Sequence, residues 1–292
     1  MNKLLVCFLL LISSVAMGQS DAFRRQRAQL TAFNIGFNGL VGGVGGLINK
    51  SDNQTGIHAF AKGFYKGAIG GTISHIGLSL THQIDKQRNI TYAWPARLVN
   101  ALGSSMIQNA AEGRRMFERL HFNLYVTRLE YYPYEKRFTG RFFTSSVYGL
   151  IVAGNNGSLD ISKSLKTGIF YFQSYEPIST SLITARNTGQ VSSIAINNAL
   201  NEVDAYYETY AHEVAHILQY DRKVGGNALL ARADQHWKLK HHWYRQLSRY
   251  IYFDLNGPIF YVAYAVEGSV HRCNLFEQEA VNYANRVEYL CH

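Results

Sequence analysis

The sequence predicts an α+β fold, in which a glycine-rich helical segment precedes a mixed or antiparallel sheet and two further helices. Three observations lead to this prediction. Residues 33–82 carry glycines at three- and four-residue spacing, residues 120–173 contain short alternating, β-branched and aromatic runs, and residues 203–220 and 274–284 return to helical periodicity. We therefore expect a helical segment over residues 19–119 and a second segment over residues 120–292 that combines the sheet with the last two helices.

The N-terminus has the pattern of a secretory signal peptide. Residues 1–3 form a short basic start, residues 4–15 are apolar, and the small residues Ala16 and Gly18 precede Gln19. This apolar run is too short for a stable membrane span. We expect residues 1–18 to be removed and the chain to be exported, to the periplasm, the envelope or the extracellular space.

The glycines of residues 33–82 predict a helical hairpin whose two arms approach closely. They recur at Gly39, Gly43 and Gly46 in the first arm and at Gly63, Gly67 and Gly71 in the second, with a loop over residues 50–56. Each glycine weakens a helix in water by roughly 1 kcal/mol, so packing or membrane contact must offset this loss. Lys62 and Lys66 disfavour a full span. We expect packing, with peripheral membrane or envelope association through residues 33–82 as the alternative.

The following elements are predicted in order along the chain. Residues 88–119 continue as helix, with Pro95 near its start. Strands are expected over residues 122–129, 141–153 and 168–173, with a turn at residues 154–157. A further strand over residues 191–196 leads into the helix at residues 203–220.

That helix contains the run His212-Glu213-Val214-Ala215-His216, an H-E-x-x-H pattern. Residues four apart share one face of a helix, so both imidazoles point to the same spot and can hold one zinc ion. Glu213 is the next residue round the helix and lies close enough to take a proton from a zinc-bound water. The pattern predicts zinc ligation by His212 and His216 and general-base catalysis by Glu213.

Two histidines leave a catalytic zinc ion one protein ligand short. A metzincin arrangement is excluded, because the positions of its glycine and third histidine hold Gln219 and Arg222. A carboxylate on the helix at residues 274–284 is the better candidate. Glu277 shares the apolar face of that helix, whereas Glu279 projects towards the opposite side. We expect Glu277 to be the third ligand, with Glu279 as the fallback.

H-E-x-x-H followed by a distant E-x-x-A resembles the gluzincin group of zinc metallopeptidases. The Gln after the second His and the Phe-Glu-Gln-Glu-Ala run are similar to a bacterial secreted or envelope subgroup that pairs H-E-x-x-H-x-x-Q with E-x-E-A-D. The resemblance covers residues 204–222 and 274–288. It implies a zincin-like catalytic domain, with His212, His216 and Glu277 as ligands and Glu213 as base.

One departure from the subgroup's pattern concerns the support of a zinc ligand. The Asp that follows the Ala is Val281 here, so the usual carboxylate behind a ligating histidine is missing. Such partners orient the ligands and tune the metal affinity. Asp254, Glu279 or a backbone carbonyl takes that place, or the site is weakened.

These features predict a secreted zinc metallopeptidase that hydrolyses a peptide or protein substrate with a zinc-activated water. A donor to the tetrahedral oxyanion is expected among Tyr261, Tyr264 and His271, between which the sequence does not choose. The alternative is a non-enzymatic envelope or membrane-associated protein in which the histidine site is structural or vestigial.

The charge of the chain does not point to nucleic acid. Lys and Arg outnumber Asp and Glu by 29 to 20, a net charge of +9. The basic residues are scattered, and no nucleic-acid-binding motif accompanies them, so we expect no nucleic-acid partner.

Overall fold

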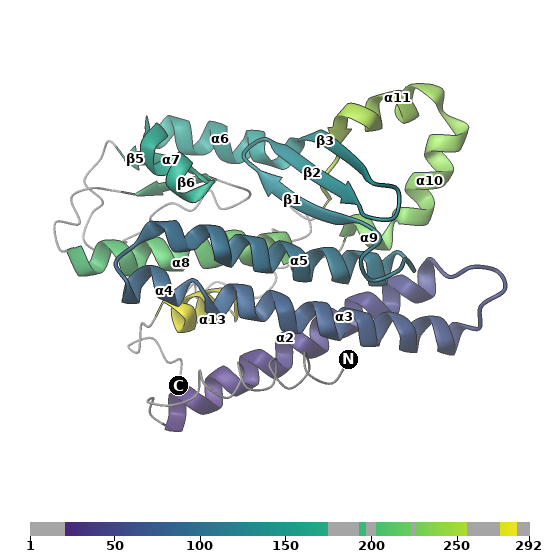
Figure 1. The fold of residues 1–292 in the computed structure, drawn as a ribbon, viewed down its shortest axis with the longest axis horizontal. Helices are drawn as coiled ribbons and strands as arrows, with labels where there is room; N and C mark the ends of the chain where they lie inside the picture. Colours follow the sequence, from purple (N-terminus) through teal and green to yellow (C-terminus); the bar gives the residue numbers. More distant parts are fainter. Residues whose placement is uncertain (1–20, 175–192, 197–202, 223–225, 256–274, 285–292) are drawn as a thin grey trace.

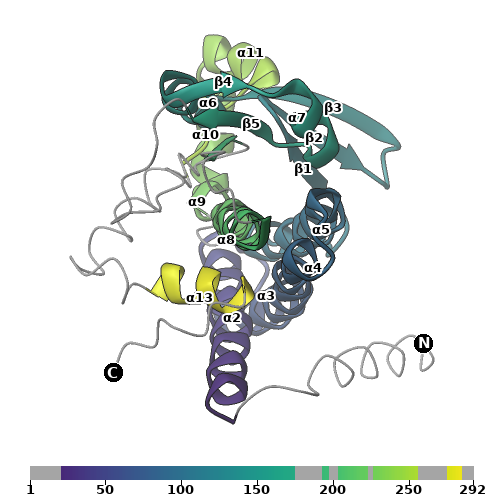
Figure 2. The same cartoon turned by 90° about the vertical axis from the view of Figure 1, so that its left-hand side faces the viewer.

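The computed structural model describes residues 21–174, 193–196, 203–222, 226–255 and 275–284. Its elements lie in three levels (Figures 1 and 2). Two small sheets with their short helices form the first level, helices α5 and α8 lie side by side in the second, and α2, α3 and α13 lie beyond them. The α+β class is therefore confirmed, and helices predominate. The signal peptide expected over residues 1–18 lies outside the described residues.

The helical hairpin is present, and its glycines face inwards. It consists of α2 (Asp21–Ile48) and α3 (Gly56–Ser79), and Thr55 caps α3 by accepting a hydrogen bond from the backbone N–H of His58. Gly63 and Gly67 lie against the backbone of α2, and Gly70 lies against the backbone of α5 (Ala93–Ala111). Because a Cβ at these positions would overlap backbone atoms, only glycine allows the three helices to approach so closely.

The inward glycines give a stability prediction with an internal control. A methyl group at Gly67 would overlap the carbonyl oxygen of Asn38, whereas a methyl group at Gly36 meets no atom within 4 Å. We expect Gly67→Ala to lower the free energy of unfolding by about 1–3 kcal/mol. Gly36→Ala is expected to leave it unchanged or raise it by up to about 1 kcal/mol. Urea denaturation measures both, and an equal response of the two variants would contradict this helix packing.

The outer side of the hairpin remains apolar. Leu40 and Val44 of α2 are 51% and 41% exposed. By length and composition, residues Ala28–Ile48 are apolar enough to cross a membrane, a test that core helices and signal sequences also pass. Membrane or envelope association through residues 33–82 therefore stays a prediction.

The helix predicted over residues 88–119 is shorter than expected. The chain passes through α4 (His82–Lys86) and the 3-10 turn η1 (Ile90–Tyr92) before α5 begins. Helix α5 ends at Ala111, because Gly113 adopts a φ of 73° that does not continue a helix.

The first sheet has the order β1-β2-β3-β7. Its strands are β1 (Leu120–Leu124), β2 (Thr127–Tyr132), β3 (Arg137–Phe143) and β7 (Ile251–Tyr252). Strands β1, β2 and β3 are antiparallel, whereas β7 runs parallel to β3. The single strand predicted over residues 122–129 is wrong, because Tyr125 has a φ of 51° and turns the chain between β1 and β2.

The strand predicted over residues 141–153 is also wrong beyond Phe143, where helix α6 (Thr144–Asn156) begins. Ser146, Gly149 and Ala153 are buried, a spacing of three and four that belongs to a helix face. Ala153 packs against Phe172 and Ala195 of the second sheet. The turn predicted at residues 154–157 is the end of α6 and the start of β4 (Gly157–Leu159).

The second sheet has the order β4-β5-β6, with β4 antiparallel and β6 parallel to β5. Strand β5 (Phe170–Ser174) follows the short helix α7 (Ile161–Thr167), which Asp160 caps and Gly168 ends with a φ of 68°. Strand β6 (Ser193–Ile196) precedes α8 (Val203–Arg222) in the chain, as the sequence predicts.

A shared core holds the two predicted segments together. Residues 209–220 of α8 are all buried. The main apolar cluster joins Leu78 and Ala96 from the first segment to Tyr171, Leu218 and Tyr283 from the second. The other described helices are α9 (Gly226–Leu229), α10 (Ala231–Lys240), α11 (His242–Tyr250) and α13 (Leu275–Tyr283). Helix α8 is therefore a central element held from several sides, which fixes the positions of its polar side chains.

Candidate metal centre

The two histidines of the H-E-x-x-H run meet on one face of α8. The Nε2 atoms of His212 and His216 are 3.0 Å apart. Their rings lie at 87° to each other, with centroids 4.6 Å apart. Each side chain belongs to a residue that is 9% exposed. Both Nε2 atoms thus face one small, largely buried volume.

Helix α13 brings a carboxylate to the same place. The two oxygens of Glu277 lie 3.4 Å from Nε2 of His212 and 3.4 Å from Nε2 of His216. Within the described part of the chain, these three residues form the group whose ligand atoms all lie within 4.8 Å of one another. Two ligands about 2.1 Å from a tetrahedral zinc ion are about 3.4 Å apart, so the observed spacing fits one zinc ion.

The charges of the group also favour a cation. Burial raises the pKa of Glu277, but hydrogen bonds and charge from His212 and His216 outweigh it and hold that pKa well below its usual range. Burial lowers the pKa of His216, but its hydrogen bond to Glu277 and the charges of Glu277 and Glu213 raise it to about 9. The imidazoles therefore lie in a negative field, and a bound divalent cation would take the place of the proton.

Glu213 follows the first histidine and is 4% exposed. The negative charge of Glu213 contributes to the raised pKa of His216. The neighbouring Val214 and Ala215 are fully buried, so apolar groups surround the polar ones on α8. A low local dielectric constant strengthens the electrostatic interaction between a carboxylate and a nearby water molecule.

Behind His216 lies a chain of hydrogen bonds that leads through Gln219 to Glu279. Nδ1 of His216 is 3.0 Å from Oε1 of Gln219. The amide nitrogen of Gln219 donates to the backbone oxygen of Phe276 at 2.9 Å and to Glu279 at 2.8 Å. Asn34 of α2 donates to the other oxygen of Glu279. Glu279 therefore contacts the ring of His216 indirectly, through Gln219.

This chain sets the tautomer of His216. The Gln219 amide nitrogen faces two acceptors, so its oxygen must face the imidazole, and an amide oxygen only accepts hydrogen bonds. The proton of neutral His216 then lies on Nδ1, and Nε2 keeps its lone pair for a metal. Asn34 is the member that sequence reasoning missed. Its only sign in the sequence is that it is a polar residue within the uncharged glycine-rich stretch. In the structure Asn34 is buried.

We expect Gln219→Leu to weaken zinc binding by about 10–100-fold, because His216 loses the acceptor that orients it. Titration against a chromogenic chelator measures the affinity. Gln235→Leu, on the exposed side of α10, is the matched control and should bind zinc like the unaltered chain. An unchanged affinity in Gln219→Leu would contradict the supporting role.

Other candidate residues have different surroundings. Asp221 is half-buried and accepts a hydrogen bond from Asn123 at 2.8 Å, and desolvation raises its pKa to about 6. Asp254, an alternative support for a ligand, accepts from Tyr220 and Ser145 at 2.8 and 2.7 Å. The proposed oxyanion donors Tyr261, Tyr264 and His271 lie outside the described residues.

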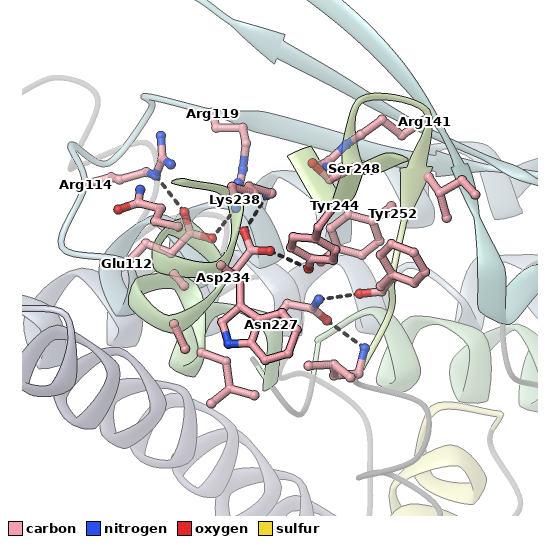
Figure 3. Close-up of a pocket in the computed structure, with 18 of the residues that line it drawn as sticks. Glu112, Arg114, Arg119, Arg141, Asn227, Asp234, Lys238, Tyr244, Ser248 and Tyr252 are labelled. Atoms are coloured by element: carbon pink, nitrogen blue, oxygen red, sulfur yellow. Dashed lines mark hydrogen bonds and ion pairs between the residues drawn. The ribbon is translucent and has the colours of Figure 1, made fainter. Parts of the chain in front are cut away.

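A cavity of about 490 Å³ lies elsewhere, between α10, α11 and the first sheet (Figure 3). Its cations are already paired. Arg119 and Arg114 bind Glu112, Arg141 binds Glu130, and Lys238 binds Asp234. We interpret these pairs as the contacts that hold this corner of the fold together, and the cavity contains none of the candidate metal ligands.

Comparison of this chain with family models, with curated proteins and with solved structures gives no match.

Proposed function

We propose that the chain is a zinc-dependent metallopeptidase that hydrolyses peptide bonds in a peptide or protein substrate. The observation that carries the proposal is the meeting of His212, His216 and Glu277 at zinc-ligand spacing. Glu213 directly follows His212 in the sequence. A catalytic zinc site has three protein ligands and keeps its fourth position for water or substrate. The resemblance to gluzincins assigns the same four residues the same roles.

Each residue then has a defined task. His212, His216 and Glu277 would hold zinc, which acidifies a bound water and polarises a carbonyl. Glu213 takes the proton from the attacking water and later passes it to the leaving amine. Gln219 and Glu279 keep the ring of His216 in place.

Export of the chain is part of the proposal. Its support is the short basic start, the apolar core and the small residues before Gln19. An exported peptidase would act on periplasmic, envelope or extracellular peptides.

Burial of the site supports a second candidate. All four side chains belong to residues that are at most 9% exposed. A structural zinc site is closed, whereas a catalytic one admits substrate. A non-enzymatic envelope protein with a structural metal site is therefore the alternative.

One experiment separates the two functions. The purified chain is analysed for metal and incubated with an unfolded protein substrate, with and without a zinc chelator. A peptidase is expected to carry about one zinc ion per chain and to lose hydrolysis with the chelator and regain it with added zinc. Zinc without hydrolysis would favour the structural site. Absence of zinc would overturn the peptidase and leave the non-enzymatic envelope protein with a vestigial site.

A further inference from the structure

Helices α10 and α11 form a corner that projects from the body beside the first sheet (Figures 1 and 2). Within 20 residues they expose five large apolar or aromatic side chains. These are Trp237 at 53%, Leu239 at 82%, Trp243 at 61%, Leu247 at 36% and Tyr250 at 72%. Isolated exposed apolar residues are common, but a group on neighbouring helices indicates a contact surface.

Helix α11 shows the pattern most clearly. Trp243, Leu247 and Tyr250 are spaced by four and three, so they form one stripe, and that stripe faces solvent. The side that faces the protein carries Tyr244 and Ser248 instead. Tyr244 donates to Asp234 at 2.7 Å and stacks on Phe253, and Ser248 is buried. The helix is amphipathic, yet its apolar side points away from the core.

Basic residues accompany this stripe. Residues 231–250 contain five Lys or Arg and one Asp, a net charge of 5 − 1 = +4, together with three His. Arg245 and Arg249 are exposed on α11, beside the apolar stripe, and Lys240 is exposed on α10. Lys238 is paired with Asp234, and Arg232 is paired with Asp52 of the loop before α3, so the unpaired cations of this described stretch are Lys240, Arg245 and Arg249. The surface therefore combines Trp, Tyr and Leu with unbalanced positive charge.

We propose that α10 and α11 form a peripheral binding surface for a membrane that contains anionic lipids. Trp and Tyr favour the boundary between headgroups and acyl chains, where their rings are buried and their polar atoms stay hydrated. Lys and Arg on the same helix bind anionic headgroups. The outward apolar stripe of α11 lies in the plane of such an interface, with Arg245 and Arg249 at the headgroups.

The distribution of charge argues against a symmetric dimer through this surface and against α2 as the membrane-binding surface. A symmetric dimer through this surface would place the same +4 patch on both sides of the interface, which disfavours association. The outer side of α2 is apolar but has no charge over residues 33–49, so it lacks attraction for anionic lipid. The inference thus places membrane contact on α10 and α11 and not on residues 33–49 of α2, and it does not depend on the peptidase proposal.

The test is cosedimentation of the full chain with phosphatidylcholine vesicles and with vesicles that also contain phosphatidylglycerol. We expect binding that requires phosphatidylglycerol and weakens as salt rises. The apolar pair Trp243→Gln with Tyr250→Gln and the charge pair Arg245→Glu with Arg249→Glu should each lower affinity by about tenfold or more. The matched control pair, Leu40→Gln with Val44→Gln at two exposed positions of α2, should bind like the unaltered chain. Circular dichroism verifies that every variant is folded.

Fluorescence gives an independent measurement on the same proteins. The chain has three Trp, of which Trp237 and Trp243 belong to this surface and Trp94 to α5. Lipids brominated in the acyl chain should quench the unaltered chain, and Trp243→Phe should lose part of that quenching. Equal binding by the α11 variants and the unaltered chain would overturn the proposal. Loss of binding in the Leu40 and Val44 pair alone, or a dimer that Trp243→Gln dissociates, would also overturn it.

Discussion

Glu213→Gln is expected to lower the rate of peptide hydrolysis by about 100-fold or more while the chain keeps its zinc. The amide has nearly the shape of the carboxylate but cannot accept the proton of the attacking water. Glu213 is not one of the three residues whose ligand atoms meet, so metal content should not change. Initial rates on a peptide substrate and metal analysis of the same preparation measure the two quantities.

Glu208→Gln, one turn before His212 on the same helix, is the control for this substitution. It makes the same chemical change outside the proposed ligand group and should keep both zinc and activity. Full activity in Glu213→Gln would exclude Glu213 as the base. Loss of zinc from Glu213→Gln would instead mean that its carboxylate holds the metal.

Local spacing explains why much of the site is predictable from sequence. His212 and His216 are four residues apart, and helix geometry alone places them on one face. The helical phase of residues 274–284 also selects Glu277, because Ala280 and Ala284 share its buried side. These predictions need only the period of one helix at a time.

The support behind His216 needs tertiary contacts that no local pattern contains. Asn34 and Glu279 are 245 positions apart and meet because α2 crosses α13. Helical phase predicts that Glu279 points away from Glu277. In the structure both carboxylates contact α8, where Glu277 approaches the two histidines and Glu279, 1% exposed, accepts a hydrogen bond from Gln219. Helical phase gives the direction in which a side chain points around the helix axis. It does not say which other elements lie in that direction.

The error at residues 144–153 has a different cause. This stretch is rich in apolar, β-branched and aromatic residues, a composition that suits a strand. Its buried positions Ser146, Gly149 and Ala153 follow helical spacing, and two of them are small enough to carry little hydrophobic signal. Small residues allow a helix to pack closely on the second sheet, and the same small size hides the period from sequence analysis.

Glu277→Ala is expected to reduce zinc affinity by more than about 100-fold, because it removes a ligand and not only a residue that orients one. The two histidines would remain, 3.0 Å apart, with their shared carboxylate gone. Added zinc should also no longer stabilise the folded state of Glu277→Ala. At a free zinc concentration about 1,000 times the dissociation constant, binding stabilises a protein by about 4 kcal/mol, which a thermal shift detects. The variant should lose this shift at the same zinc concentration.

Glu279→Ala gives the comparison that makes the first result interpretable. Sequence phase alone predicts a neutral effect, whereas the hydrogen bond from Gln219 predicts a loss of about tenfold in zinc affinity. We therefore expect zinc affinity to decrease from the unaltered chain to Glu279→Ala and further to Glu277→Ala. Glu279→Ala should still show a zinc-dependent thermal shift. A larger loss for Glu279→Ala than for Glu277→Ala would reverse the assignment, since the residue that binds the metal must matter more than the residue that positions His216 through Gln219.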